Sequence, residues 1–121
     1  MRSRLIAINT TRGVRLTECG RVADNYLTRV VGLLCDRQLE LGDGLWIKPC
    51  NSIHSIGMRF IFDAIFLDRD LQVVHMMSQM KPWRISKIVL SAKSVLEVPS
   101  GIIAQTATQM GDKFEMRLDV L

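Results

Sequence analysis

The chain has 121 residues, of which 48% are hydrophobic and 23% are charged, and it contains 8 glycines and 3 prolines. This composition is typical of one globular domain with its own core, and it excludes a disordered tail, a collagen-like fibre and a low-complexity linker. The formal net charge of +4 is compatible with an acidic partner, although the chain carries no clear nucleic-acid-binding motif.

Most of the predicted elements are short β-strands. Apolar runs bounded by turn-forming residues indicate strands, and such runs occupy, in chain order, residues 5–9, 14–17, 45–47, 60–68, 71–80, 88–91, 95–98 and 113–120. One helix is expected over residues 22–32, where apolar side chains recur about every four positions and Gly32 ends the pattern. The chain is therefore predicted to be mainly β: a single domain, residues 1–121, built as an antiparallel β-sandwich or small barrel-like fold with one short helix in its N-terminal half.

The cysteines and the start of the chain bear on its compartment. Cys19, Cys35 and Cys50 are an odd number without a CxxC pair, so we expect reduced thiols rather than a disulfide framework. The apolar run at residues 5–8 is too short for a secretory signal, and no run reaches the roughly 18 apolar residues of a membrane span. The chain is expected to be soluble and cytoplasmic.

An acidic residue interrupts the strongest strand. Asp63 lies in the otherwise apolar run of residues 60–67, and an aspartate is unfavourable in a strand. A buried carboxylate without a partner costs several kcal/mol or shifts its pKa strongly. We therefore expect Asp63 to accept backbone N–H bonds from the loop before the strand. The functional alternative is a carboxylate at the floor of a pocket.

A second carboxylate lies in the predicted strand 95–98. Alternation points Glu97 away from the face of its two neighbours, so it either faces solvent or pairs with Arg84 or Arg59. If Glu97 and Asp63 lay side by side, the two carboxylates could act as a general acid and a general base. The sequence leaves open whether they approach each other.

The irregular loop 50–58 holds three side chains that can bind soft metal ions. Cys50, His54 and Met58 recur every four residues, and His75 would add the second imidazole of a typical copper ligand set. Cys50 and His54 could also form a thiolate–imidazolium pair, but no third, orienting residue is indicated. We expect instead that His54 fixes the loop through hydrogen bonds and that no metal or cofactor is bound.

Residues 81–93 contain four cations, no acid and one tryptophan. Pro82 cannot donate to a sheet ladder, so the chain leaves its strand there and Trp83 lies in a loop between Lys81 and Arg84. An indole beside cations is a contact that an acidic or planar ligand, or an acidic protein, can use. We expect instead that Trp83 folds over the end of the sheet and closes the core, as large aromatic side chains usually do, with the cations directed outward; contact with such a ligand is the alternative.

Six short motifs are spread along residues 16–118. They are R-V-V-G-L-L at 29–34, G-L-W-I at 44–47, I-H-S-I-G-M at 53–58 with the strand 60–68 after it, P-W-R at 82–84, V-L-E-V-P-S-G at 95–101 and G-D at 111–112. Together they resemble a small prokaryotic family of uncharacterised proteins, the domain-of-unknown-function family one-nine-two. The chain differs from that family's usual pattern at Ser100, where alanine is usual, and many relatives have Trp-Met-Lys-Asn in place of the histidine loop.

The resemblance implies a compact, mostly β domain, sandwich-like or barrel-like, with a small helix, and it implies no reaction. We interpret the chain as a small soluble binding or interaction module of unknown biochemical function. The alternative is an enzyme or soft-metal site built on the His54 loop with Asp63 and Glu97. A cleft in which these three converge would favour the enzyme, whereas separate buried positions would favour the module.

Overall fold

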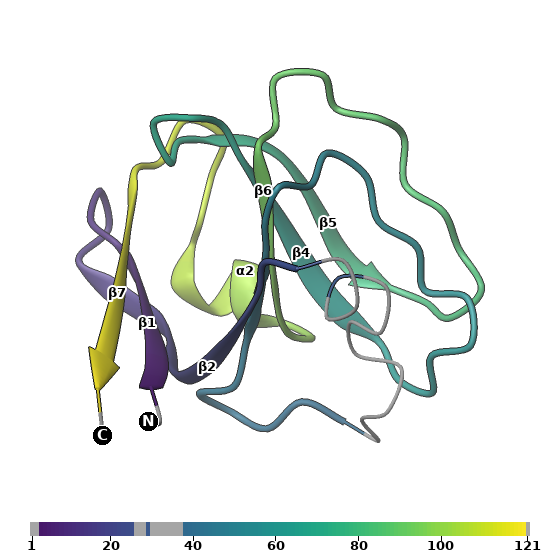
Figure 1. Cartoon of the computed structure of the whole chain (residues 1–121), viewed down its shortest axis with the longest axis horizontal. Coiled ribbons are helices and arrows are strands. Elements are labelled where there is room, and N and C mark those ends of the chain that lie inside the picture. The colour runs from purple at the N-terminus through teal and green to yellow at the C-terminus, as the bar shows by residue number, and fades with distance from the viewer. Residues whose placement is uncertain (1–2, 26–28, 30–37, 121) are drawn as a thin grey trace.

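The strands form one bent sheet. The computed structural model describes residues 3–25, 29 and 38–120, and Figure 1 labels its elements. They are β1 (Ser3–Asn9), β2 (Val14–Ala23), β3 (Leu45–Ile47), β4 (Phe62–Leu67), β5 (Val73–Met80), β6 (Ser94–Pro99), α2 (Ile102–Thr106) and β7 (Phe114–Val120). In this part of the chain the strand order is β5-β4-β6-β3-β2-β1-β7. The mainly β prediction is confirmed, with the refinement that β2 and β3 pair in parallel while the other pairs are antiparallel.

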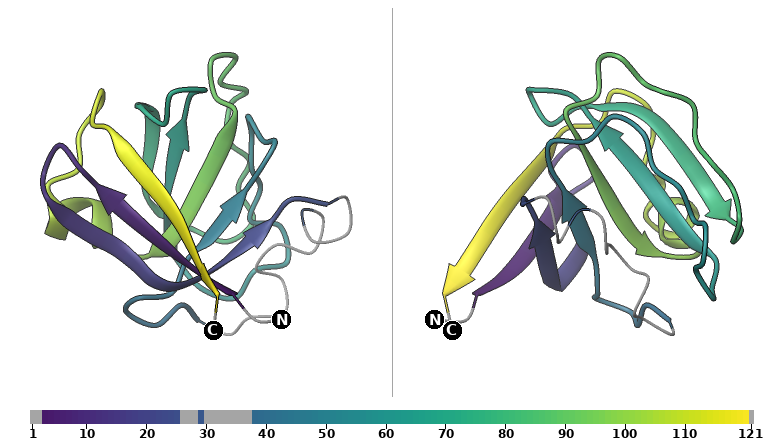
Figure 2. Two further views of the ribbon diagram at one scale, coloured as in Figure 1. Left: turned by 60° about the vertical axis from the view of Figure 1, so that its left-hand side comes forward. Right: turned by 45° about the vertical axis from the view of Figure 1, so that its right-hand side comes forward.

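β2 belongs to two arms of the sheet. Its earlier part pairs with β1, and its last residues, Arg21–Ala23, pair with β3. Register shifts interrupt the β1–β2 pairing close to this change of partner, and such irregularities bend a strand. Figure 2 shows β7, β1 and the start of β2 as one arm and β3, β6, β4 and β5 as the other. The edge strands meet at their beginnings, where Gln72 and Lys113 form an isolated bridge, so the sheet curls without closing into a barrel.

Apolar side chains cover both faces of the arm formed by β3, β6, β4 and β5. The inner core fills the angle between the arms, where α2 also packs (Figure 1); it comprises Leu5, Ala7, Leu16, Trp46, Ile65, Leu67, Val73, Leu96, Val98, Ile102, Ile103 and Phe114. The outer core lies on the opposite face, under the loops that precede β4 and β6; it comprises Ala23, Leu45, Ile47, Ile53, Met58, Phe62, Ala64, Phe66, Met80, Val89, Ala92 and Val95. Because both faces are covered, every residue of β4 and β6 is buried, which explains their nearly continuous apolar sequences.

The helix predicted over residues 22–32 begins too early. Val22 and Ala23 are the last residues of β2, because their backbone pairs with β3. A helical hydrogen bond from the Arg29 N–H to the Asn25 carbonyl oxygen, at 3.0 Å, follows the strand. Residues 26–28 and 30–32 of the predicted helix lie outside the described residues, as does Cys35.

Two further elements differ from the prediction. Residues 88–91 form no strand: Val89 is buried and its N–H donates to the Asn51 carbonyl oxygen at 2.9 Å, while Ile88 and Leu90 point outward. The helix α2 was not predicted, because its five residues are too few for a helical period to be recognised. None of the helices in the described part of the chain is long and apolar enough to cross a membrane.

A close approach at Gly44 leads to a prediction about stability. A Cβ atom at this position would lie 2.5 Å from Thr17 Oγ1 and 2.9 Å from Thr17 Cγ2, and Thr17 is fully buried. We expect Gly44→Ala to lower the free energy of unfolding by about 1–3 kcal/mol through overpacking, measured by urea denaturation. Thr17→Ala should restore part of that loss in the double variant. A Gly44→Ala protein as stable as the parent would show that the contact yields without strain.

Candidate functional site

Asp63 is a buried structural brace. It lies on the inner face of β4 with Ile65 and Leu67, and its side chain is fully buried. Its Oδ1 accepts the N–H of Gln79 at 2.8 Å, and its Oδ2 accepts the N–H of Ile103 at 2.9 Å. The expected burial and N–H bonds are confirmed, but the expected donors are wrong: they belong to β5 and α2 rather than to the loop before the strand. Asp63 thus holds an edge strand and the helix against the centre of the sheet.

Glu97 is a buried carboxyl group on the other face. It stands on the outer face of β6 with Val95, between Leu45 of β3 and Ala64 of β4. The residue is 3% exposed, so the solvent-facing alternative is wrong. Neither Arg84 nor Arg59 forms an ion pair with it in the described part of the chain. Burial among apolar side chains raises the pKa of Glu97 to about 8, so the carboxyl group is mostly protonated at neutral pH.

The two carboxyl groups do not form a pair. Although β4 and β6 are neighbours, the register places Asp63 opposite Val98 and Glu97 opposite Ala64. Successive side chains on a strand point to opposite faces, so Asp63 enters the inner core and Glu97 the outer core. The sheet itself separates them, which rules out a shared acid–base site.

His54 and Met58 occupy two further positions. His54 is exposed, its backbone bridges to Ile85, and its Nδ1 accepts the N–H of Ile56 at 3.3 Å. Met58 is buried in the outer core. The sequence-predicted pocket residues are therefore not gathered in one cleft.

The residues considered as metal ligands have ordinary structural contacts. The Cys50 thiol donates to the Ser52 carbonyl oxygen at 3.1 Å, and burial raises the pKa of the thiol, which disfavours the thiolate that a metal or a nucleophilic reaction requires. His75 packs edge-on against Phe66, with ring centroids 5.1 Å apart. Burial, with a smaller effect of Lys87, lowers the pKa of His75. Within the described residues, no three His, Cys, Asp or Glu side chains are grouped so as to hold a metal ion.

A polar cluster that we did not predict surrounds Asp112. Its Oδ2 accepts hydrogen bonds from Asn9 Nδ2, Arg12 Nε and the Gln109 N–H, each at 3.0 Å. Burial alone would raise the pKa of Asp112, but the bonds from Arg12, Asn9 and Gln109 lower it below its usual value. The Gly111-Asp112 turn was the only sequence signal for it. The cluster fastens the β1–β2 turn to the start of β7 and has the character of a structural network.

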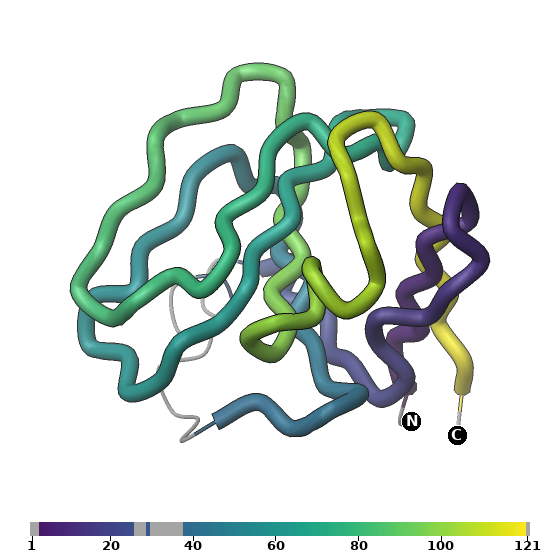
Figure 3. Tube along the Cα trace, turned by 180° about the vertical axis from the view of Figure 1, so that it is seen from behind, coloured from purple at the N-terminus to yellow at the C-terminus, as the bar shows by residue number. Residues whose placement is uncertain are grey.

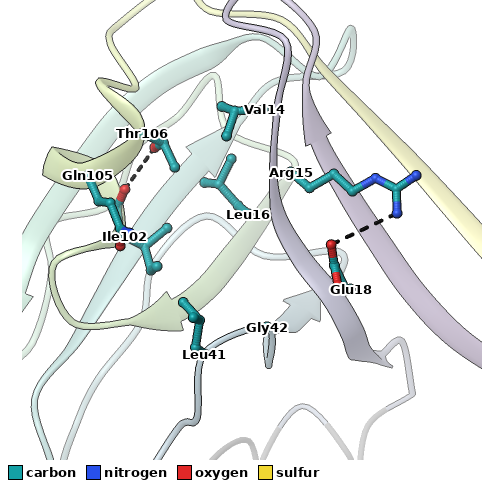
Figure 4. A pocket seen from close by; sticks show the side chains of 9 residues that line it. All are labelled: Val14, Arg15, Leu16, Glu18, Leu41, Gly42, Ile102, Gln105 and Thr106. Atoms are coloured by element: carbon teal, nitrogen blue, oxygen red, sulfur yellow. Dashed lines mark hydrogen bonds and ion pairs between the residues drawn. The ribbon is translucent and has the colours of Figure 1, made fainter.

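A pocket of about 420 Å³ opens between β2 and α2 (Figure 4). At the edge of the pocket, Arg15 Nη1 lies 4.0 Å from Glu18 Oε1, and both side chains point away from α2. The Thr106 hydroxyl donates to the Ile102 carbonyl oxygen at 2.7 Å. The side chains that face the pocket are apolar or uncharged; they are Val14, Leu16, Leu41, Ile102, Gln105 and Thr106.

Residues 81–93, which we call the basic–apolar loop, combine exposed cations with exposed apolar side chains. Trp83 is 66% exposed, and its backbone has a positive φ of 63°. The expectation that Trp83 closes the core is therefore wrong. Three more apolar side chains of this loop are exposed, namely Ile85 at 72%, Ile88 at 64% and Leu90 at 84%.

Comparison with known proteins places this architecture in a family. The model of the family DUF192, described as "Uncharacterized ACR", matches residues 7–116. The chain belongs to this family. The motif resemblance is thereby confirmed, and membership of DUF192 brings no established activity with it.

A sequence relative matches this DUF192 chain over most of its length, and two solved structures share its fold. A UPF0127 protein of Pyrococcus furiosus is 31% identical over 113 residues, which cover 89% of this chain and 95% of the relative. A crystal structure from Novosphingobium aromaticivorans, described as a protein of unknown function, has a TM-score of 0.79 at 20% identity and covers 92% of this chain and 82% of that one. A crystal structure from Sinorhizobium meliloti has a TM-score of 0.77 at 19% identity, and the match covers 94% of this chain and 92% of that one. At these identities the two structures support the fold alone.

Proposed function

We propose that the protein is a small binding module and that the basic–apolar loop is its docking surface for an anionic partner. The observation that carries the proposal is the joint exposure of Trp83 and the cations beside it. Lys81 and Arg84 flank the indole, Lys87 and Lys93 follow, and all four are exposed. Exposed Trp and Arg side chains are enriched among residues that dominate binding energies.

The charge of the loop selects the sign of the partner. There is no acid between Asp70 and Glu97, and the buried Glu97 is mostly protonated at neutral pH. The cations of the loop therefore have no acidic neighbour within their own segment. A positive surface of this kind attracts negative partners and loses that attraction as salt screens it.

The enzyme alternative has less support. Asp63, Glu97 and His54 lie respectively in the inner core, in the outer core and on the surface. A general acid–base pair needs both groups within reach of one substrate, and the sheet stands between the two carboxyl groups.

The proposal can be tested with poly-L-glutamate as a soluble anionic probe. We expect binding at low salt that weakens at physiological salt and that shifts the fluorescence of the exposed Trp83. The triple variant Lys81→Gln, Arg84→Gln, Lys87→Gln should bind at least about tenfold more weakly. A control variant removes the same number of cations elsewhere, with Arg15→Gln, Arg69→Gln and Arg117→Gln. Equal losses in the two variants would contradict a docking surface at the loop.

A further inference from the structure

We infer that the basic–apolar loop docks onto an anionic lipid surface, with its apolar side chains inserted at the boundary between the headgroups and the acyl chains. The inference rests on the proposed docking function of the same loop and names the class of its partner. It concerns attachment to one side of a bilayer.

The loop alternates inward anchors with outward side chains. Every third residue, Ser86, Val89 and Ala92, is buried, and the residues between them are exposed. The outward set therefore combines Ile85, Ile88 and Leu90 with the cations. Exposed apolar side chains gain free energy when they leave water for an apolar medium.

The backbone of the loop is held in place before any partner binds. It runs beside the segment 50–58, as Figures 1 and 3 show, and backbone hydrogen bonds join the two segments. The N–H groups of Trp83, Ser86 and Val89 donate to the carbonyl oxygens of Ser55, Ile53 and Asn51 at 3.0, 2.8 and 2.9 Å. The N–H of Arg84 donates to Ser55 Oγ at 3.0 Å. Satisfied backbone groups lower the penalty for approaching a bilayer, where water no longer supplies partners.

The side-chain chemistry fits a lipid interface better than a soluble acidic chain. A polyanion in water can use the cations but leaves the three aliphatic side chains exposed to solvent. A bilayer surface accepts both: phosphate groups for Lys81, Arg84, Lys87 and Lys93, and the acyl boundary for the aliphatic side chains. Tryptophan prefers the same boundary, because its ring is amphipathic.

An apolar groove continues this surface toward the edge of the sheet. A groove of about 510 Å³ lies between β5 and the start of the loop. Met76, Met77 and Met80 line it, together with Ile85 of the loop, and Lys81 and Arg84 stand at the same groove. The apolar surface and its cations are therefore contiguous from the edge strand to the loop.

The test uses the full chain and vesicles of two compositions. Vesicles of phosphatidylcholine with about a third phosphatidylglycerol should carry the protein with them on flotation at low salt, and vesicles of phosphatidylcholine alone should not. Brominated acyl chains should quench Trp83, and Trp83→Phe should abolish the quenching because the remaining tryptophan, Trp46, is buried. No flotation with the anionic vesicles would overturn the inference.

Variants separate insertion from plain electrostatic attraction. Ile88→Ser with Leu90→Ser keeps every cation and should weaken vesicle binding at least about tenfold while leaving binding to poly-L-glutamate unchanged. Leu41→Ser is the matched control, since Leu41 is 79% exposed elsewhere on the chain, and it should bind vesicles like the parent. Vesicle binding that survives the double variant would overturn insertion. Loop-dependent binding to poly-L-glutamate without vesicle binding would overturn the lipid partner and leave the docking surface standing; failure with both probes would end both proposals.

Discussion

Replacing Asp63 with alanine is expected to lower the free energy of unfolding by about 2–5 kcal/mol, because it removes the acceptor of two backbone donors at once, one of them buried and the other partly buried. The N–H groups of Gln79 and Ile103 both depend on this carboxylate, at 2.8 and 2.9 Å. Gln79 has a positive φ of 56°, a backbone conformation that needs support from its surroundings. Chemical denaturation followed by circular dichroism measures the loss directly.

Asp63→Asn is the matched control for this effect. The amide keeps one acceptor oxygen and nearly the same shape, so it can serve one of the two donors but not both. Its stability should lie between those of the parent and of Asp63→Ala. Equal stability of all three proteins would mean that the carboxylate does not hold β5 and α2 in place.

Glu97→Gln is expected to remove a pH dependence of stability. The pKa of Glu97 is about 8 in the folded chain, against an ordinary value of 4.5. Between these two values the folded state holds a proton that the unfolded state has released. Stability from this group is therefore fully present below about pH 4.5, falls as pH rises toward about 8, and then levels off. The full effect is on the order of a few kcal/mol.

The comparison of parent and variant isolates this group. His75 acts in the opposite direction, because its lowered pKa makes stability rise with pH, but it is present in both proteins and cancels in the difference. Urea unfolding at pH 5 and pH 8 should show the variant gaining on the parent as pH rises. A constant difference between the two proteins at both pH values would show that Glu97 titrates normally in the folded chain.

Local sequence patterns predicted the strands well where the apolar run and its boundaries agreed. Pro49 marks the end of the strand 45–47, and β3 has those bounds. Asp63 was recognisable as buried because its neighbours on both sides are strongly apolar. In each case the decisive information lies within a few residues of the position concerned.

The residues whose burial or secondary structure was predicted wrongly depend on parts of the chain that lie far away in sequence. Alternation correctly turned Glu97 away from Leu96, but the loops that cover the outer core decide that this face is dry. Val22 continues β2 because β3, more than twenty residues later, supplies a parallel partner. Trp83 is exposed although tryptophan is usually buried, because the hydrogen bond from its own backbone N–H to the Ser55 carbonyl oxygen holds the indole away from the sheet. None of these partners could be read from the local pattern.

The pairing of β1 with β7 also determines how the protein can be handled and joined to other chains. Ser3 lies opposite Val120, so β1 begins and β7 ends at the same corner of the molecule. The basic–apolar loop lies on the far side (Figure 1). A tag, a tether to a sensor chip or a fused domain attached at either end would therefore stand clear of the docking surface. Attachment at this corner leaves the surface oriented outward, toward whatever it meets in solution.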